Sequence, residues 1–79
     1  MFKMTVIDAI KVHDNLISVA GPCTNRADFS NRLVDNYGNA YDAHIPFDKT
    51  LIHNDSEIVL GIYGSYDIEV LIGRELVNG

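Results

Sequence analysis

The fold is decided by residues 55–77, which read Asp-Ser-Glu-Ile-Val-Leu-Gly-Ile-Tyr-Gly-Ser-Tyr-Asp-Ile-Glu-Val-Leu-Ile-Gly-Arg-Glu-Leu-Val. From Ile58 to Tyr63 both alternating sets of side chains are largely apolar. This pattern is typical of a strand buried on both sides, in the middle of a sheet or barrel. Gly64 ends this strand, residues 67–71 make a compact connection, and Gly73 turns the chain into a short last strand. The stretch predicts a β protein, and it names no function.

Length and cysteine content set the bounds for the rest of the chain. Its 79 residues predict one domain, residues 1–79, which buries about 60–65% of its extended-chain surface on folding. No apolar run approaches the 18 residues of a membrane-spanning helix, and the N-terminus lacks the order of a signal peptide. Cys23 is the only cysteine and cannot form an internal disulfide. We therefore expect a cytoplasmic protein without membrane association.

Turn residues divide the first third of the chain into two strands. Residues 2–12 carry apolar side chains on the even positions and form a half-buried strand, with Asp8 as the exception on the apolar face. We expect its carboxylate to accept backbone N–H groups at a bend, and a catalytic or metal role is the alternative. A turn at residues 13–15 leads into a return strand at residues 16–20, which Gly21-Pro22 ends.

The middle of the chain predicts an irregular segment followed by a hairpin. Residues 23–31 are polar, and Phe29 is their anchor in the core. Residues 32–35 and 40–47 form two strands around a turn at residues 36–39, with Tyr41 and its alternating neighbours on the buried side. The sequence from Asp35 to Asn39 resembles a calcium loop, but a tyrosine occupies a ligand position and no glutamate closes the loop, so a plain turn is the better interpretation.

The sequence contains few residues in a pattern typical of a catalytic or metal site. His13, His44, His53 and Cys23 could supply zinc ligands, but no two of them have the spacing of a metal finger. Cys23, a histidine and Asp8 match a nucleophilic triad in residue type alone, whereas triads are recognised by geometry. No phosphate-binding glycine loop is present. We therefore predict no enzyme, no cofactor and no metal site.

Charge limits the partners of the chain. Eleven acidic and six basic residues give a net charge of −5, and no two basic residues are neighbours. Nucleic-acid binding depends on clustered Lys and Arg, so this composition disfavours RNA without excluding it.

The order and spacing of several motifs resemble the second domain of the translation elongation factor Tu family. Asp8-Ala9-Ile10-Lys11-Val12 followed by Gly21 resembles the opening Asp-x-Phe-x-Ile strand of that domain and its hairpin glycine. Phe47-Asp48-Lys49-Thr50-Leu51 resembles its Phe-Arg-Lys-x-Leu. Ile62-Tyr63-Gly64, followed by Gly73 and Leu76, repeats its Leu-Arg-Gly to Gly-x-x-Leu spacing. The resemblance covers almost the whole chain and is weakest from Pro22 to Tyr41. It implies an all-β fold: a small closed β-barrel of about six to seven mostly antiparallel strands.

The departures from this family concern its function. Asp48 stands where the family has the arginine that helps to hold the aminoacyl end of tRNA, and Ile45 aligns with the glutamate that works beside it. The Gly-Arg-Gly hairpin tip is Asp14-Asn15-Leu16 here. A carboxylate in place of an arginine repels phosphate, so tRNA binding is not carried over. The resemblance implies a fold and no activity.

Three functional hypotheses follow from the sequence. The first is a non-enzymatic module that binds an unidentified protein. The second is a translation-linked RNA- or ribosome-binding barrel that uses Lys49, Arg74 and Arg32, and the third is a barrel with a small-ligand site at its mouth. The candidate interaction residues are Tyr63, Tyr66, Tyr37, His44, Asp48, Lys49 and Arg74.

Overall fold

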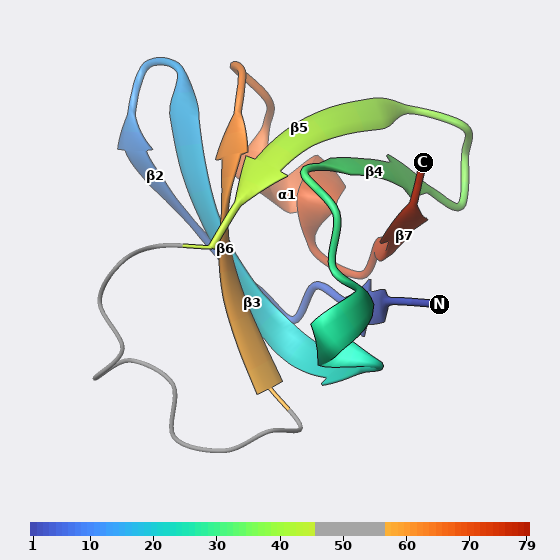
Figure 1. Cartoon of the computed structure of the whole chain (residues 1–79). Helices are drawn as coiled ribbons and strands as arrows, with labels where there is room; N and C mark the ends of the chain where they lie inside the picture. Colours follow the sequence, from blue (N-terminus) through green and yellow to red (C-terminus); the bar gives the residue numbers. More distant parts are fainter. Residues whose placement is uncertain (46–56) are drawn as a thin grey trace.

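The computed structural model describes residues 1–45 and 57–79 (Figure 1). The interpretations of Pro46, Phe47, Asp48, Lys49 and His53 lie outside these residues. The described elements, in chain order, are β1 (Lys3–Thr5), β2 (Asp8–His13), β3 (Leu16–Thr24), the 3-10 turn η1 (Arg26–Asp28), β4 (Arg32–Asp35), β5 (Ala40–His44), β6 (Glu57–Tyr63), α1 (Ile68–Leu71) and β7 (Glu75–Asn78).

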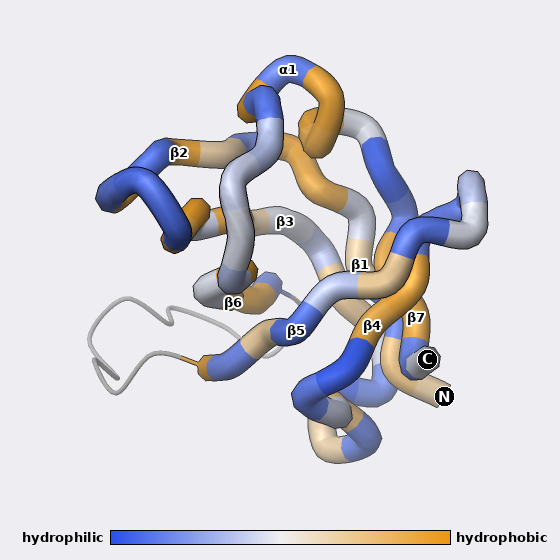
Figure 2. Tube along the Cα trace, turned by 90° about the horizontal axis from the view of Figure 1, so that it is seen from above, coloured by the Kyte–Doolittle hydropathy of each residue, from blue (hydrophilic) through white to orange (hydrophobic). Residues whose placement is uncertain are grey.

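The strands form a closed antiparallel barrel, which confirms the predicted fold class. Their order is β1-β7-β4-β5-β6-β3-β2, and a further pairing of β1 with β3 closes the first six into a ring. β2 lies outside the ring as an extra strand on β3. Seen from above in Figure 2, α1 lies beside β2, and the two chain ends lie together, as the pairing of β1 with β7 requires.

The N-terminal segment is two strands, and the prediction of one strand over residues 2–12 is wrong. Val6 leaves the strand to bind the turn before β7: its N–H donates to the Arg74 carbonyl at 2.9 Å and its own carbonyl accepts from Gly73 at 2.7 Å. The buried set switches from even to odd positions across this break, so Ala9 is buried while Ile10 is 62% exposed. The expected burial of Asp8 is also wrong, because Asp8 begins β2 and is exposed.

β3 continues through the Gly21-Pro22 pair, which was predicted to end it. Pro22 faces outward, opposite Glu57 of β6. On its other edge β3 pairs with β2 as far as Ala20 and with β1 from Cys23. The missing N–H of Pro22 therefore falls between two partner strands, where the proline removes no ladder hydrogen bond.

Gly21 is the point where the ring closes. The Thr5 carbonyl packs against its Cα so closely that a Cβ there would overlap the carbonyl oxygen. This contact brings the end of β1 onto the middle of β3, and only glycine permits such an approach.

The core fills the ring with side chains from every barrel strand and from α1. Phe29 packs against this core as predicted, with its ring 5.4 Å from that of Phe2. The prediction that β6 is buried on both of its sides is wrong, because Tyr63 on its outer side is exposed. Among the described residues, the largest fully buried side chains are Phe2, Met4, Val6, Ile17, Val19, Leu33, Ile58, Leu60, Ile62, Leu71 and Leu76.

We expect Gly21→Ala to destabilise the protein by about 3 kcal/mol or more, because the added methyl group meets backbone that cannot rotate away. Urea unfolding followed by circular dichroism measures this loss. Gly38→Ala is the matched control: Gly38 has a positive φ of 87° but open space around its Cα, so only backbone strain of roughly 1 kcal/mol is expected. Equal stability of the two variants would contradict the role of Gly21 in closure.

Candidate functional site

An outward surface across four neighbouring strands gathers two of the predicted interaction residues. Directly opposed residues of antiparallel strands point to the same side of a sheet. One row of such residues runs Ile10, Ser18, Gly61 and His44, from β2 through β3 and β6 to β5. The next row runs His13, Leu16, Tyr63 and Asp42. We call the seven residues Ile10, His13, Leu16, Ser18, His44, Gly61 and Tyr63 the aromatic face.

The centre of the aromatic face is a stacked pair of rings. His44 and Tyr63 lie 4.8 Å apart between ring centroids and 26° from parallel. Gly61 makes the stack possible, because a Cβ on it would overlap the His44 ring. His44 Nδ1 is buried without a hydrogen-bond partner among the described residues, whereas Tyr63 is 52% exposed. The histidine therefore supports the tyrosine, and the outer side of the tyrosine ring is open to solvent.

We expect Gly61→Ala to displace the His44 ring and to cost about 1–3 kcal/mol of stability, since a methyl group takes the space below the ring. In NMR spectra the ring-current shifts of the His44 ring protons should disappear. Ser18→Ala, in the same row of the sheet, should leave those shifts in place. Unchanged His44 shifts in Gly61→Ala would show that the stack does not depend on the glycine.

A second cluster surrounds Asp35, the one charged residue that is buried in the described part of the chain. Its carboxylate accepts hydrogen bonds from the backbone N–H groups of Tyr37 and Asn39 at 2.8 and 2.9 Å. It also accepts from the Asn39 side chain at 3.1 Å and from the Tyr41 hydroxyl at 2.6 Å. These bonds shape the β4–β5 turn, and they confirm the plain turn predicted for this segment.

Arg74 completes this cluster from a distant part of the chain. Its guanidinium lies 3.2 Å from the Asp35 carboxylate and 3.9 Å above the centre of the Tyr37 ring. Its Nε donates to the Val70 carbonyl at 2.9 Å. Tyr37 and Arg74, both predicted as interaction residues, therefore lie together in internal contacts away from the aromatic face.

The cluster shifts the pKa values of the Asp35 carboxyl group and the Tyr41 hydroxyl group. Burial of Asp35 opposes its charge, but the hydrogen bonds from Tyr41, Asn39 and Tyr37 outweigh it and lower the pKa of Asp35 to about 2 from an ordinary 3.8. Burial and the bond to Asp35 raise the pKa of Tyr41 to about 12. Because the pKa of Asp35 is lower in the folded state, its charge stabilises the fold above pH 3.8, and this stabilisation is lost as the pH falls toward 2.

We expect Asp35→Asn to destabilise the protein by about 2–4 kcal/mol at pH 7, because the pKa-linked stabilisation is lost and Arg74 is left without its anion. The difference from the unsubstituted protein should narrow as the pH falls from 4 to 2. Thermal unfolding across this pH range tests both statements. Asp42→Asn removes an exposed carboxylate and should change stability by less than about 0.5 kcal/mol. A constant difference at every pH would contradict the linkage to Asp35.

The remaining predicted residues lie elsewhere. The ring of Tyr66 packs edge-on against that of Tyr41, with 5.1 Å between the ring centroids, and it covers Gly64. Part of the Tyr66 ring is therefore in contact with other residues of the barrel. Asp48 and Lys49 lie outside the described residues. Sequence reasoning missed Gly61, and it placed Asp35 at a turn without predicting its burial or its contact with Arg74. A glycine inside a strand pattern signals a close approach, and an aspartate before a turn signals local hydrogen bonds, so both carried a usable signal.

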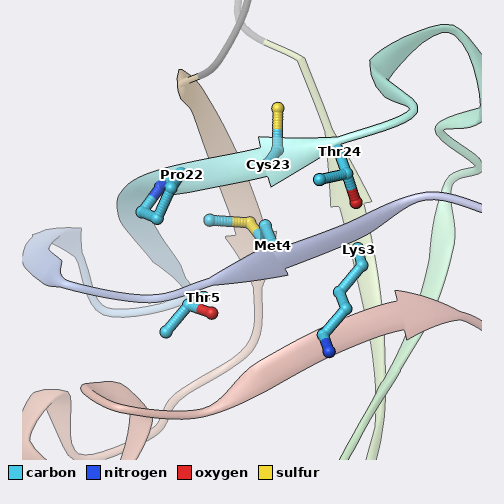
Figure 3. Close-up of a pocket in the computed structure, with 6 residues that line it drawn as sticks. All are labelled: Lys3, Met4, Thr5, Pro22, Cys23 and Thr24. Carbon is cyan, nitrogen blue, oxygen red and sulfur yellow. The ribbon is translucent and has the colours of Figure 1, made fainter.

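Two surface hollows lie among residues 1–45 and 57–79, and neither holds a set of polar groups aimed at one point. A hollow of about 220 Å³ lies between β1 and β3, where Figure 3 shows the Cys23 thiol pointing away from Lys3 and Thr5. Lys3 is paired with Glu75 at 3.6 Å. Burial raises the pKa of Cys23, although the nearby Arg26 acts in the opposite direction. The raised pKa disfavours the thiolate that a nucleophile needs. A second hollow, of about 480 Å³, is lined by Lys11, Tyr66, Asp67, Ile68 and Glu69.

Within residues 1–45 and 57–79, no three His, Cys, Asp or Glu side chains are grouped so that they could hold a metal ion. No helix in these ranges is long and apolar enough to cross a membrane.

Comparisons of the chain with protein-family models, with curated proteins and with solved structures found no match. The fold class therefore rests on the barrel itself, and the resemblance to the second domain of elongation factor Tu stays a prediction.

Proposed function

We propose that this chain is a non-enzymatic β-barrel module that binds another protein through the aromatic face. The observation that carries the proposal is the exposed Tyr63 ring, held by His44 over Gly61 and continued by Leu16 and Ile10 on neighbouring strands. A tyrosine supported by rigid neighbours combines a large apolar area with a polar tip, and such residues are enriched where proteins bind one another.

The position of the basic residues favours this proposal over RNA binding. Arg74 was a predicted RNA contact, and its guanidinium is engaged by Asp35, Tyr37 and the Val70 carbonyl. Arg32 stands opposite Asp42, whose charge opposes binding of phosphate. With a net charge of −5, the chain offers little counterion release to a nucleic acid.

The remaining alternative, a small-ligand site, has weaker support. Of the two hollows among the described residues, the one beside Cys23 is bordered by a lysine already paired with Glu75, and the one beside α1 is lined by side chains of both charges. Ligand sites need polar groups that converge on one point. We infer further that the module is cytoplasmic and that it is related to the second domain of elongation factor Tu, as the motif spacing suggests.

We expect the immobilised protein to retain a defined protein from a lysate of its source organism at moderate salt. Tyr63→Ala should reduce this retention at least about tenfold, which corresponds to about 1.4 kcal/mol. Retained proteins and retained RNA are quantified separately, at low and at moderate salt, after circular dichroism has shown that the variant is folded.

Tyr37→Ala is the matched control, since Tyr37 is more exposed than Tyr63, at 71%, but lies away from the aromatic face. It should retain the partner like the unsubstituted chain. RNA that is retained at low salt and lost as salt rises would favour the translation-linked alternative. Equal losses with both tyrosine variants would contradict the aromatic face as the binding surface.

A further inference from the structure

The aromatic face has acidic residues at its corners. Asp8 begins β2, and Glu57 begins β6 at the same end of the sheet. Asp42 follows Tyr63 in its row, and Asp14 lies in the β2–β3 turn next to His13. All four are exposed, and none of them forms an ion pair with another described residue.

No described cation forms an ion pair with any of these four carboxylates. Lys11 stands opposite Ile17, whose side chain is buried in the core, so it lies on the other side of the sheet. Arg26 donates to the backbone carbonyl of Glu57 at 3.4 Å and not to its carboxylate. Arg32 is beyond Asp42, on β4, and makes no ion pair with it. An apolar centre surrounded by four carboxylates that no described cation pairs has a negative potential that attracts cations.

We propose that the aromatic face binds a short basic segment of another protein, in which Lys or Arg residues flank apolar ones. This inference rests on the proposed function and specifies its partner. The apolar side chains of the segment lie on Leu16 and Ile10, and an arginine or lysine lies on the open side of the Tyr63 ring within reach of Asp42. A cation over an aromatic ring is attracted by the electrons of the ring, and a carboxylate beside it adds a charged hydrogen bond.

The size of the aromatic face indicates a segment and not a folded domain. Four adjacent strands span about 14 Å at roughly 4.8 Å per step, and five residues along a strand span about 13 Å. The resulting area is on the order of 200 Å², well below the roughly 800 Å² per partner of a standard protein interface. An extended segment of about five residues matches this width.

The same charges argue against two other occupants. A second copy of this chain would bring its own Asp8, Asp14, Asp42 and Glu57 against these four, and like charges facing each other are unfavourable. Nucleic acid would bring phosphates toward the same carboxylates.

A peptide selection tests the inference. A library of random 12-residue peptides is selected on the whole protein, and binders that Tyr63→Ala also retains are removed. We expect the remaining sequences to share Lys or Arg on both sides of apolar residues. A synthetic peptide of the shared sequence should shift the NMR signals of β3, β5 and β6.

Charge-reversal variants test the role of the acidic corners. Asp42→Lys and Glu57→Lys should each weaken binding of this peptide about fivefold or more. Glu69→Lys is the control with the same change in net charge. Glu69 is exposed on α1 and lines a hollow with Lys11, which lies on the opposite side of β2 from Ile10. Its variant should change binding less than about twofold because salt screens distant charges. A peptide with Glu in place of its Lys and Arg should bind Asp42→Lys better than it binds the unsubstituted protein.

Each other outcome overturns the inference in a recognisable way. Peptides that depend on Tyr63 but are neutral or acidic would remove the basic chemistry and leave the proposed function standing. If no peptide is selected but a lysate protein is captured through Tyr63, the result is the same: the partner would then bind with a folded surface and not with a short basic segment, and the proposed function would stand. Self-association lost in Tyr63→Ala, measured by sedimentation, would assign the face to a second copy. If neither peptides nor lysate proteins depend on Tyr63, the proposed function falls together with the inference.

Discussion

The Asp35 carboxylate joins parts of the barrel that no local interaction connects. It accepts five hydrogen bonds, four from the β4–β5 hairpin and one from Arg74, which lies 39 positions further along the chain. A buried charge is costly unless it is paired and hydrogen-bonded, and here every donor comes from a fixed position of the fold. The connection between α1 and β7 is therefore held against the hairpin, and the guanidinium of Arg74 is engaged by contacts within the molecule.

The closure of the ring explains why the aromatic face lies on the outside of the barrel. β3 is long enough to pair with β2 at one end and with β1 at the other, and the Gly21 contact joins the two regions. β2 then extends the outer surface beyond the ring, adding Ile10 to the rows that contain Gly61 and Tyr63. A small barrel has little interior to spare for a ligand once its core is packed, and the surface proposed here for binding accordingly lies on the outer side of the sheet.

Much of the fold was readable from local patterns, and the errors have a common cause. The turn at residues 36–39, the strand Arg32–Asp35 and the Phe29 anchor were predicted correctly, because turn chemistry and alternation are local properties. The errors at Val6, Gly21 and the outer side of β6 all occur where a strand changes its partner or meets solvent. Of the candidate site, Tyr63 and His44 were named in advance, whereas their stacking and the internal role of Arg74 depend on register and were not.

By itself the sequence determined the all-β class, most turn positions and the excess of acidic residues. Only the tertiary structure decided which residues share the aromatic face, because His13, Leu16, Tyr63 and Asp42 come from four separate strands. Periodicity assigns a side chain to one side of its own strand, but the pairing of strands decides its neighbours. The same reason applies to Asp35 and Arg74: their charges are visible in the sequence, and their contact arises only when the ring closes.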